Sequence, residues 1–107
     1  MTRKKRITHH EPDDLDAMIA EATAEDPRFP ARLEAARRRR QLVERLADFR
    51  REQGQTQRDV AATMRTSQSA VARLERETYD TLSSTLDDFA LALGYRIEYS
   101  LVKIDEA

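Results

Sequence analysis

The 107-residue chain has the length of one small domain, with 36% of its residues charged and 39% in the apolar set. This balance predicts a thin hydrophobic core beneath a well-solvated surface. The absence of cysteine excludes disulfides, thiolate metal sites and cysteine nucleophiles. No apolar run approaches the roughly 18 residues that span a bilayer. We therefore expect a soluble cytoplasmic protein without a membrane partner.

The net charge of -1 conceals three blocks of alternating sign. Residues 11–26 carry seven acids and no base, residues 28–51 carry nine bases and three acids, and residues 77–107 carry seven acids and two bases. A polyanion is the expected partner of the middle block, and a basic or self-complementary partner is expected at the ends. Solvated helix faces without any partner explain the pattern equally well.

Residues 1–10 are basic and polar without periodicity, and we expect a disordered tail there. His9 and His10 do not indicate a metal site, because adjacent side chains point in different directions and no further histidine or cysteine completes a ligand set. The sequence therefore predicts neither a metal nor a cofactor.

Residues 11–30 are predicted to form an acidic helical extension. Its helix starts at Pro12 and ends near Asp26, before Pro27 and Pro30 interrupt the chain. The apolar positions follow the i, i+3, i+4, i+7 spacing of an amphipathic helix at Leu15, Met18, Ile19 and Ala22. This apolar face either binds a basic protein partner or packs on the protein's own core or across a dimer.

A long helix is predicted to start after Pro30 and to run to Gln53, with Gly54 as its left-handed C-terminal cap. Within it, the run Arg37 to Arg40 goes all the way round the helix, so part of the run must face water or phosphate.

After Gly54 the predicted helices become short. Thr56 caps a helix that ends near Met64, and Ser67 caps one that ends near Arg76. A cap within residues 81–84 starts a further helix that ends at Leu93 before Gly94. Together these helices form a domain over residues 31–94.

Residues 95–107 form a predicted dimerisation strand and tail, since apolar and polar residues alternate from Tyr95 to Ile104. No other segment of the chain is predicted to be a strand, so we expect this one to pair with its copy in a homodimer. The expected dimerisation residues are Tyr95, Ile97, Tyr99 and Leu101.

The second short helix is unusual, because Val71 and Leu74 are its only bulky apolar residues and its N-terminal half exposes small polar side chains. A helix enters the major groove only if its leading face is free of bulky apolar groups. The stretch GQTQRDVAATMRTSQSAVARLE resembles the helix-turn-helix of the XRE family, the Cro and phage-repressor type, and the resemblance covers residues 41–94. It implies an all-α, mostly helical protein with a five-helix Cro/C1-type domain.

The resemblance also implies the residues that contact DNA. In that family Gln57 contacts phosphate, Gln68, Ser69 and Arg73 face bases, and Arg76 lies near the backbone. The turn between the two helices adds Arg65, Thr66 and Ser67. Where the family often has glycine at a positive φ, this chain has Arg65, at a cost of about 1 kcal/mol if the turn is the same.

The domain order, with the segment EDPRFPARLEAARR before the motif and LALGYRIEYSLV after it, resembles a HigA-type antitoxin of a type II toxin–antitoxin system. This resemblance implies three partners: a small basic RelE/HigB-like ribonuclease toxin, the double-stranded palindromic operator of the protein's own operon, and a second copy. It places the protein at the bacterial nucleoid.

Two alternatives remain at this level, a stand-alone repressor without a toxin and a module that mainly binds protein. An enzyme is not expected, because the sequence has no glycine-rich phosphate loop and no constellation of carboxylates with histidine.

Overall fold

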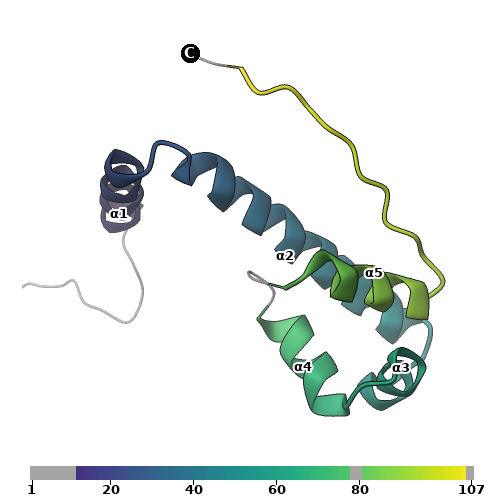
Figure 1. The fold of residues 1–107 in the computed structure, drawn as a ribbon. Helices are drawn as coiled ribbons and strands as arrows, with labels where there is room; N and C mark the ends of the chain where they lie inside the picture. Colours follow the sequence, from purple (N-terminus) through teal and green to yellow (C-terminus); the bar gives the residue numbers. More distant parts are fainter. Residues whose placement is uncertain (1–11, 78–80, 106–107) are drawn as a thin grey trace, which may run out of the picture. The chain divides into compact units, whose positions relative to one another are not determined.

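A computed structural model describes residues 12–77 and 81–105, and within these ranges it contains five α-helices and no β-strand (Figure 1). The all-helical prediction is therefore confirmed, whereas the predicted tail at residues 1–10 lies outside the described residues. The chain divides into two compact units, Met1–Arg37 and Arg38–Ala107.

In the first unit, α1 (Pro12–Glu25) has the predicted bounds to within one residue. The Asp26 carboxylate then accepts the Arg28 backbone N–H and pairs with Arg32 at 2.8 Å. Of the apolar stripe on α1, Leu15 and Met18 are 42% and 52% exposed. Ile19 and Ala22, the other two members, are half-buried.

Helix α2 (Phe29–Glu52) begins before Pro30, so the prediction of a start after that proline was wrong. The backbone N–H groups of the first helical turn have no acceptor within the helix, so a proline, which has no N–H, loses no hydrogen bond there. The fixed φ of proline also suits the helical conformation.

The second unit is a core formed by the second half of α2 with α3 (Gln57–Met64), α4 (Gln68–Arg76) and α5 (Ser83–Ala92). Helices α2, α4 and α5 contribute apolar residues at the three- and four-residue spacing that places them on one face, and α3 contributes two adjacent residues. The core consists of Val43, Leu46, Val60, Ala61, Val71, Leu74, Leu86, Phe89, Ala90 and Leu93. Phe89 is the largest of its fully buried side chains.

The ends of the helices follow the predicted signals with one exception. Gly54 and Gly94 adopt φ of 74° and 87° after α2 and α5, as expected of left-handed caps. Thr56 and Asp59 form a complete capping box on α3. The N-cap of α5 is Leu82, which makes no side-chain cap hydrogen bond, so the prediction that a hydroxyl within residues 81–84 caps this helix was wrong.

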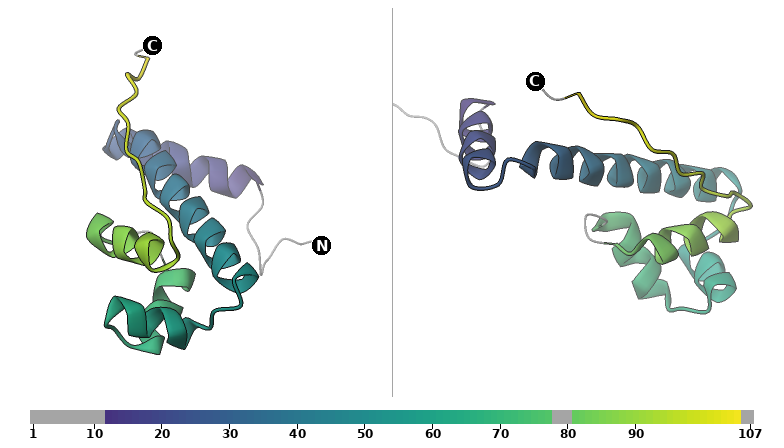
Figure 2. Two further views of the ribbon diagram at one scale, coloured as in Figure 1. Left: turned by 90° about the vertical axis from the view of Figure 1, so that its right-hand side faces the viewer. Right: turned by 45° about the horizontal axis from the view of Figure 1, so that its top comes forward.

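The predicted strand at Tyr95–Ile104 is not present, and the described residues 95–105 are not in regular secondary structure. From Gly94 the chain turns back along the second half of α2 (Figure 2). A strand needs a neighbouring edge to satisfy its backbone groups, and the described part of this chain contains no second strand.

Side chains instead attach this segment to its own domain. The Tyr95 ring stacks on Phe49 at 4.5 Å with an interplanar angle of 11°, and Ile97 packs against the core. The Tyr99 hydroxyl donates to the Asp87 carboxylate at 2.7 Å. Among the predicted dimerisation residues, only Leu101 is fully exposed.

Candidate nucleic-acid interface

Helices α3 and α4 form two packed short helices joined by a tight turn. Arg65 ends α3 in the left-handed conformation, with φ 58° and ψ 47°. The Arg65 N–H donates to Ala62 O, and the Thr66 N–H donates to Ala61 O at 2.9 Å. Arg65 is the only non-glycine residue with positive φ in the described part of the chain. The turn therefore has the geometry of a glycine turn, and the arginine costs about 1 kcal/mol relative to glycine.

The candidate recognition helix α4 has two distinct faces. The Ser67 hydroxyl caps its N-terminus by accepting the Ala70 N–H at 3.1 Å. Val71 and Leu74 are buried, with exposed fractions of 1% and 6%. The outer face carries the predicted DNA-contacting residues of this helix, and all of these are exposed: Gln68, Ser69, Arg73 and Arg76, along with Arg65, Thr66 and Ser67 in and after the turn.

A chain of hydrogen bonds connects this outer face to the interior. Gln68 Nε2 donates to Gln57 Oε1 at 2.7 Å, and Gln57 Nε2 donates to Glu75 Oε1 at 2.9 Å. Gln57 thus uses its carbonyl oxygen and one of its two amide hydrogens within the protein, and the orientation of its amide is held. The predicted phosphate-contacting residue is therefore already positioned before any ligand arrives.

The network ends at a buried ion pair that the sequence analysis did not identify. Arg50 Nε donates to Glu75 Oε2 at 2.7 Å and Arg50 Nη2 donates to Glu75 Oε1 at 3.1 Å, and the two side chains are only 10% and 9% exposed. Arg50 Nη1 also donates to the Gln55 carbonyl at 2.9 Å. This two-point pairing attaches α4 to α2.

The spacing of the apolar residues contains a signal for this pair. Glu75 follows the buried Val71 by four residues, and Arg50 follows the buried Leu46 by four. Both charged residues therefore lie on the inner faces of their helices, where an unpaired charge would be costly.

A second arginine of α2 reaches the same end of α4. Arg40 Nη1 donates to the Glu75 carbonyl at 2.6 Å, and its Nε pairs with Glu44 at 3.2 Å. Arg37 and Arg38, in the same run, are exposed as the sequence requires. One member of the run is thus a structural contact to the recognition helix.

Asp59 shows how the start of α3 is stabilised. Its carboxylate accepts the Thr56 backbone N–H at 2.9 Å, and the Thr56 hydroxyl accepts the Asp59 N–H at 3.0 Å. These two bonds to Thr56, the backbone bond foremost, lower the pKa of Asp59 below its ordinary value of 3.8.

The described residues contain no group of three or more His, Cys, Asp or Glu side chains able to hold a metal ion. Among the same residues, no helix is both long and apolar enough to cross a bilayer. The site thus consists of the exposed polar face of α4, with the buried Arg50–Glu75 ion pair on the opposite, inner side of the helix.

Comparisons with known proteins agree with this geometry. The family model described as "Helix-turn-helix" matches residues 46–100. The chain is 40% identical over 89 residues to "Antitoxin HigA1" of Mycobacterium tuberculosis, in both strain CDC 1551 / Oshkosh and strain H37Rv. The alignment covers 83% of this chain but only 60% of those relatives, so the chain spans less than two thirds of their length. No solved structure matches the chain.

Proposed function

Because the chain belongs to the helix-turn-helix family, we propose that it binds double-stranded DNA through α4 and represses its own operon as the antitoxin of a toxin–antitoxin pair. The observation that carries this proposal is the exposed polar face of α4, backed by the hydrogen-bonded series from Gln68 to Glu75. A prepositioned polar face matches what readout of base edges in the major groove requires.

We assign a specific role to each polar residue of this surface. Arg73 binds a guanine, because its guanidinium fork bonds O6 and N7 together, while Gln68 and Ser69 contact neighbouring base edges. Gln57 contacts a phosphate at the entrance of the groove, and Arg76 contacts the backbone beyond it. The turn residues Arg65, Thr66 and Ser67 lie between Gln57 and Gln68 in the sequence.

The DNA part is tested by fluorescence anisotropy with a duplex selected from random sequence. Arg73→Ala is expected to relax the preference at one base position per half-site, whereas Gln57→Ala is expected to weaken binding to all duplexes alike. Equal losses on selected and random DNA for both variants contradict the assigned roles.

The antitoxin part is supported by the similarity to Antitoxin HigA1 and by the charge of the first unit. We assign toxin binding to the acidic α1, whose stripe of Leu15, Met18, Ile19 and Ala22 includes two large exposed apolar side chains. A RelE/HigB-like ribonuclease must hold polyanionic RNA, so its basic surface suits an acidic helix. In this role the protein is cytoplasmic and associated with the nucleoid.

This part is tested by affinity purification of the tagged protein from its native cells at low salt. We expect a stoichiometric small basic protein that arrests growth when expressed alone. Met18→Asp in α1 should abolish its recovery, and Leu91→Asp should serve as the matched control because Leu91 is also exposed, at 61%, but lies on α5. Recovery of a DNA palindrome without any such protein points to a stand-alone repressor instead.

The proposed repressor is a homodimer, because two half-sites of a palindromic operator require two linked recognition helices. The exposed end of the C-terminal segment supports this, since Leu101 has no cover in the single chain. Light scattering of the purified protein measures the oligomeric state directly.

A further inference from the structure

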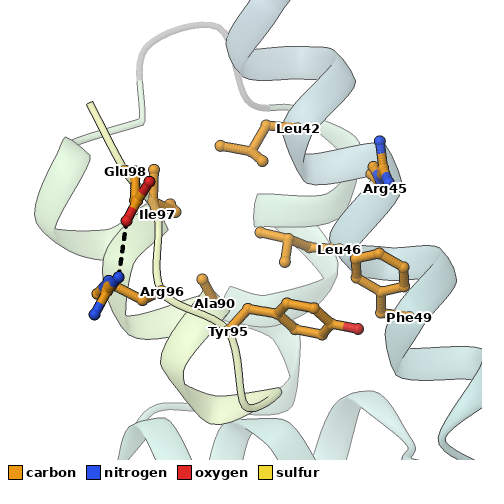
Figure 3. A pocket seen from close by; sticks show the side chains of 9 residues that line it. All are labelled: Leu42, Arg45, Leu46, Phe49, Ala90, Tyr95, Arg96, Ile97 and Glu98. Atoms are coloured by element: carbon orange, nitrogen blue, oxygen red, sulfur yellow. Dashed lines mark hydrogen bonds and ion pairs between the residues drawn. The ribbon is translucent and has the colours of Figure 1, made fainter. Parts of the chain in front are cut away.

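Helix α2 presents two different sides to the rest of the second unit. One side faces the C-terminal segment and lines a groove with it (Figure 3). The other side has the spacing i, i+3, i+7, i+10, which keeps side chains in one row along a helix. This row consists of Arg40, Val43, Ala47 and Arg50. The row begins and ends with an arginine, and both arginines bond to the same residue of α4.

That residue is Glu75, in the last turn of α4. The Arg50 guanidinium pairs with its carboxylate at 2.7 Å, and Arg40 Nη1 donates to its backbone carbonyl oxygen at 2.6 Å. Ten residues separate the two arginines, which corresponds to about 15 Å along a helix axis. Neither side chain covers that distance alone, so Glu75 lies between the two arginines along α2. Two contacts from two directions fix the position of Glu75 more closely than either contact does.

The Arg40 contact is favoured by its surroundings. The Glu75 carbonyl is one of the last four of α4, which have no donor within the helix, and a cation is favourable at that end of the helix dipole. Glu44 Oε2 accepts from Arg40 Nε at 3.2 Å and so orients the guanidinium plane. The Arg40 side chain is only 23% exposed, so the protein covers most of its surface.

We propose that Arg40 is a positioning residue for DNA readout, which holds the end of α4 so that Arg73 meets its base in the correct place. This inference rests on the DNA binding through α4 proposed above. Arg73 lies two residues before Glu75 on the same helix, so a displacement of Glu75 moves Arg73 as well. A binding group has to be held within about 0.5 Å of its productive position, so small displacements matter.

The other contacts of α4 do not replace this one. Val71 and Leu74 are buried, but apolar packing is not directional. The Arg50–Glu75 pair is directional but acts through the end of a side chain, whereas Arg40 bonds to the backbone of α4 itself. Without Arg40 the helix keeps its packing and its ion pair, while its backbone end is free to shift by distances that base contacts do not tolerate.

Arg40 lies in a part of α2 that precedes the matched domain. The residues that match the helix-turn-helix family are 46–100, and α2 begins well before them, at Phe29. The contact therefore depends on the N-terminal extension of α2 in this chain. Sequence spacing does not identify the contact, because it joins residues 35 positions apart.

The test compares a duplex selected for binding with a duplex of random sequence, by fluorescence anisotropy of the full chain at several salt concentrations. Arg40→Met removes the donor and the charge. We expect its affinity for the selected duplex to fall about tenfold, the size of one lost base contact, and its affinity for the random duplex to change little. The slope of log affinity against log salt should stay the same, because no phosphate contact is lost.

Two further variants serve as controls. Arg51→Met removes one charge from the same helix, where Arg51 pairs with Asp48, and we expect it to keep the ratio of the two affinities. Arg40→Lys keeps a charge and a donor at this position, and we expect it to recover most of the affinity for the selected duplex.

Measurements on the free protein separate positioning from a general loss of structure. The carbonyl carbon resonance of Glu75 senses the hydrogen bond from Arg40, so it should shift in Arg40→Met, whereas the carbonyl resonance of Val71 should not. Circular dichroism should show the original helix content, because the core and the Arg50–Glu75 pair are unchanged.

Several outcomes overturn the inference while the proposed DNA binding stands. They are an Arg40→Met variant that keeps the original preference for the selected duplex, an equal loss on both duplexes, and an Arg40→Lys variant that recovers nothing. A salt slope that falls by about one unit also overturns it, since Arg40 then contacts a phosphate itself. If the original protein binds neither duplex, the proposed DNA binding fails and this inference fails with it.

Discussion

Replacing Arg50 by methionine is expected to destabilise the protein by about 3 to 5 kcal/mol, because it leaves the Glu75 carboxylate buried without its counter-charge. The geometry supports a value in this range. Both side chains are at most 10% exposed, and two short bonds of 2.7 and 3.1 Å join them. After the substitution, the donor that remains within reach of the carboxylate is the neutral amide of Gln57. Small domains have only about 5 to 15 kcal/mol of total stability, so this loss is large.

The measurement is a double-mutant cycle by urea denaturation, followed by circular dichroism. The double variant Arg50→Met, Glu75→Met removes both charges and should be within about 1 kcal/mol of the original protein, far more stable than either single variant. Arg51→Met is the control, because the Arg51–Asp48 pair is 57% and 61% exposed and should contribute at most about 0.5 kcal/mol.

Two results would refute this reasoning. One is a single Arg50→Met variant that loses less than about 1 kcal/mol, as a surface pair would. The other is a double variant whose loss equals the sum of the two single losses, since this would mean that the two charges do not depend on each other.

Three further predictions concern the turn, the cap and the recognition face. Arg65→Gly should stabilise the fold by about 1 kcal/mol, since glycine adopts the left-handed conformation freely, and an unchanged urea midpoint would contradict the strain assigned to φ 58°. Because the pKa of Asp59 is lowered in the folded chain, its charge stabilises α3 above pH 3.8 and this contribution is lost as the pH falls through the folded pKa. Asp59→Asn should therefore lower the thermal midpoint at pH 7 but converge with the original protein toward pH 2, and a constant difference would exclude the charged cap. In the absence of DNA, Arg73→Ala should leave the thermal midpoint nearly unchanged. Gln57→Ala should lower the thermal midpoint, because Gln57 donates a hydrogen bond to the buried Glu75.

The local structure of this protein was predictable because local chemistry determines it. The Thr56 and Ser67 caps and the left-handed positions at Gly54 and Gly94 each depend on residues within one helical turn. The exposed face of α4 followed from the spacing of Val71 and Leu74 in the same way. The helix that includes Pro30 was placed too late because proline is tolerated in a first turn and forbidden only further on.

The contacts that tertiary structure decided join residues that are far apart in the chain. Arg50 bonds to Glu75 across 25 positions, and Gln57 bonds to Glu75 across 18. Apolar spacing places each charge on an inner face but does not say which partner meets it there, because that depends on how the helices pack.

The C-terminal segment shows the same division. Its alternating apolar and polar residues favour an extended backbone with one apolar side. Whether such a segment becomes a strand depends on a neighbouring edge, and α2 and α5 offer side chains instead, through the Phe49 ring and the Asp87 carboxylate. The sequence alone determined the helices, the caps at Thr56 and Ser67 and the polar face of α4, because those depend on near neighbours. The folded chain decided what holds that face in place and where the last residues lie, because both depend on partners brought together only by packing.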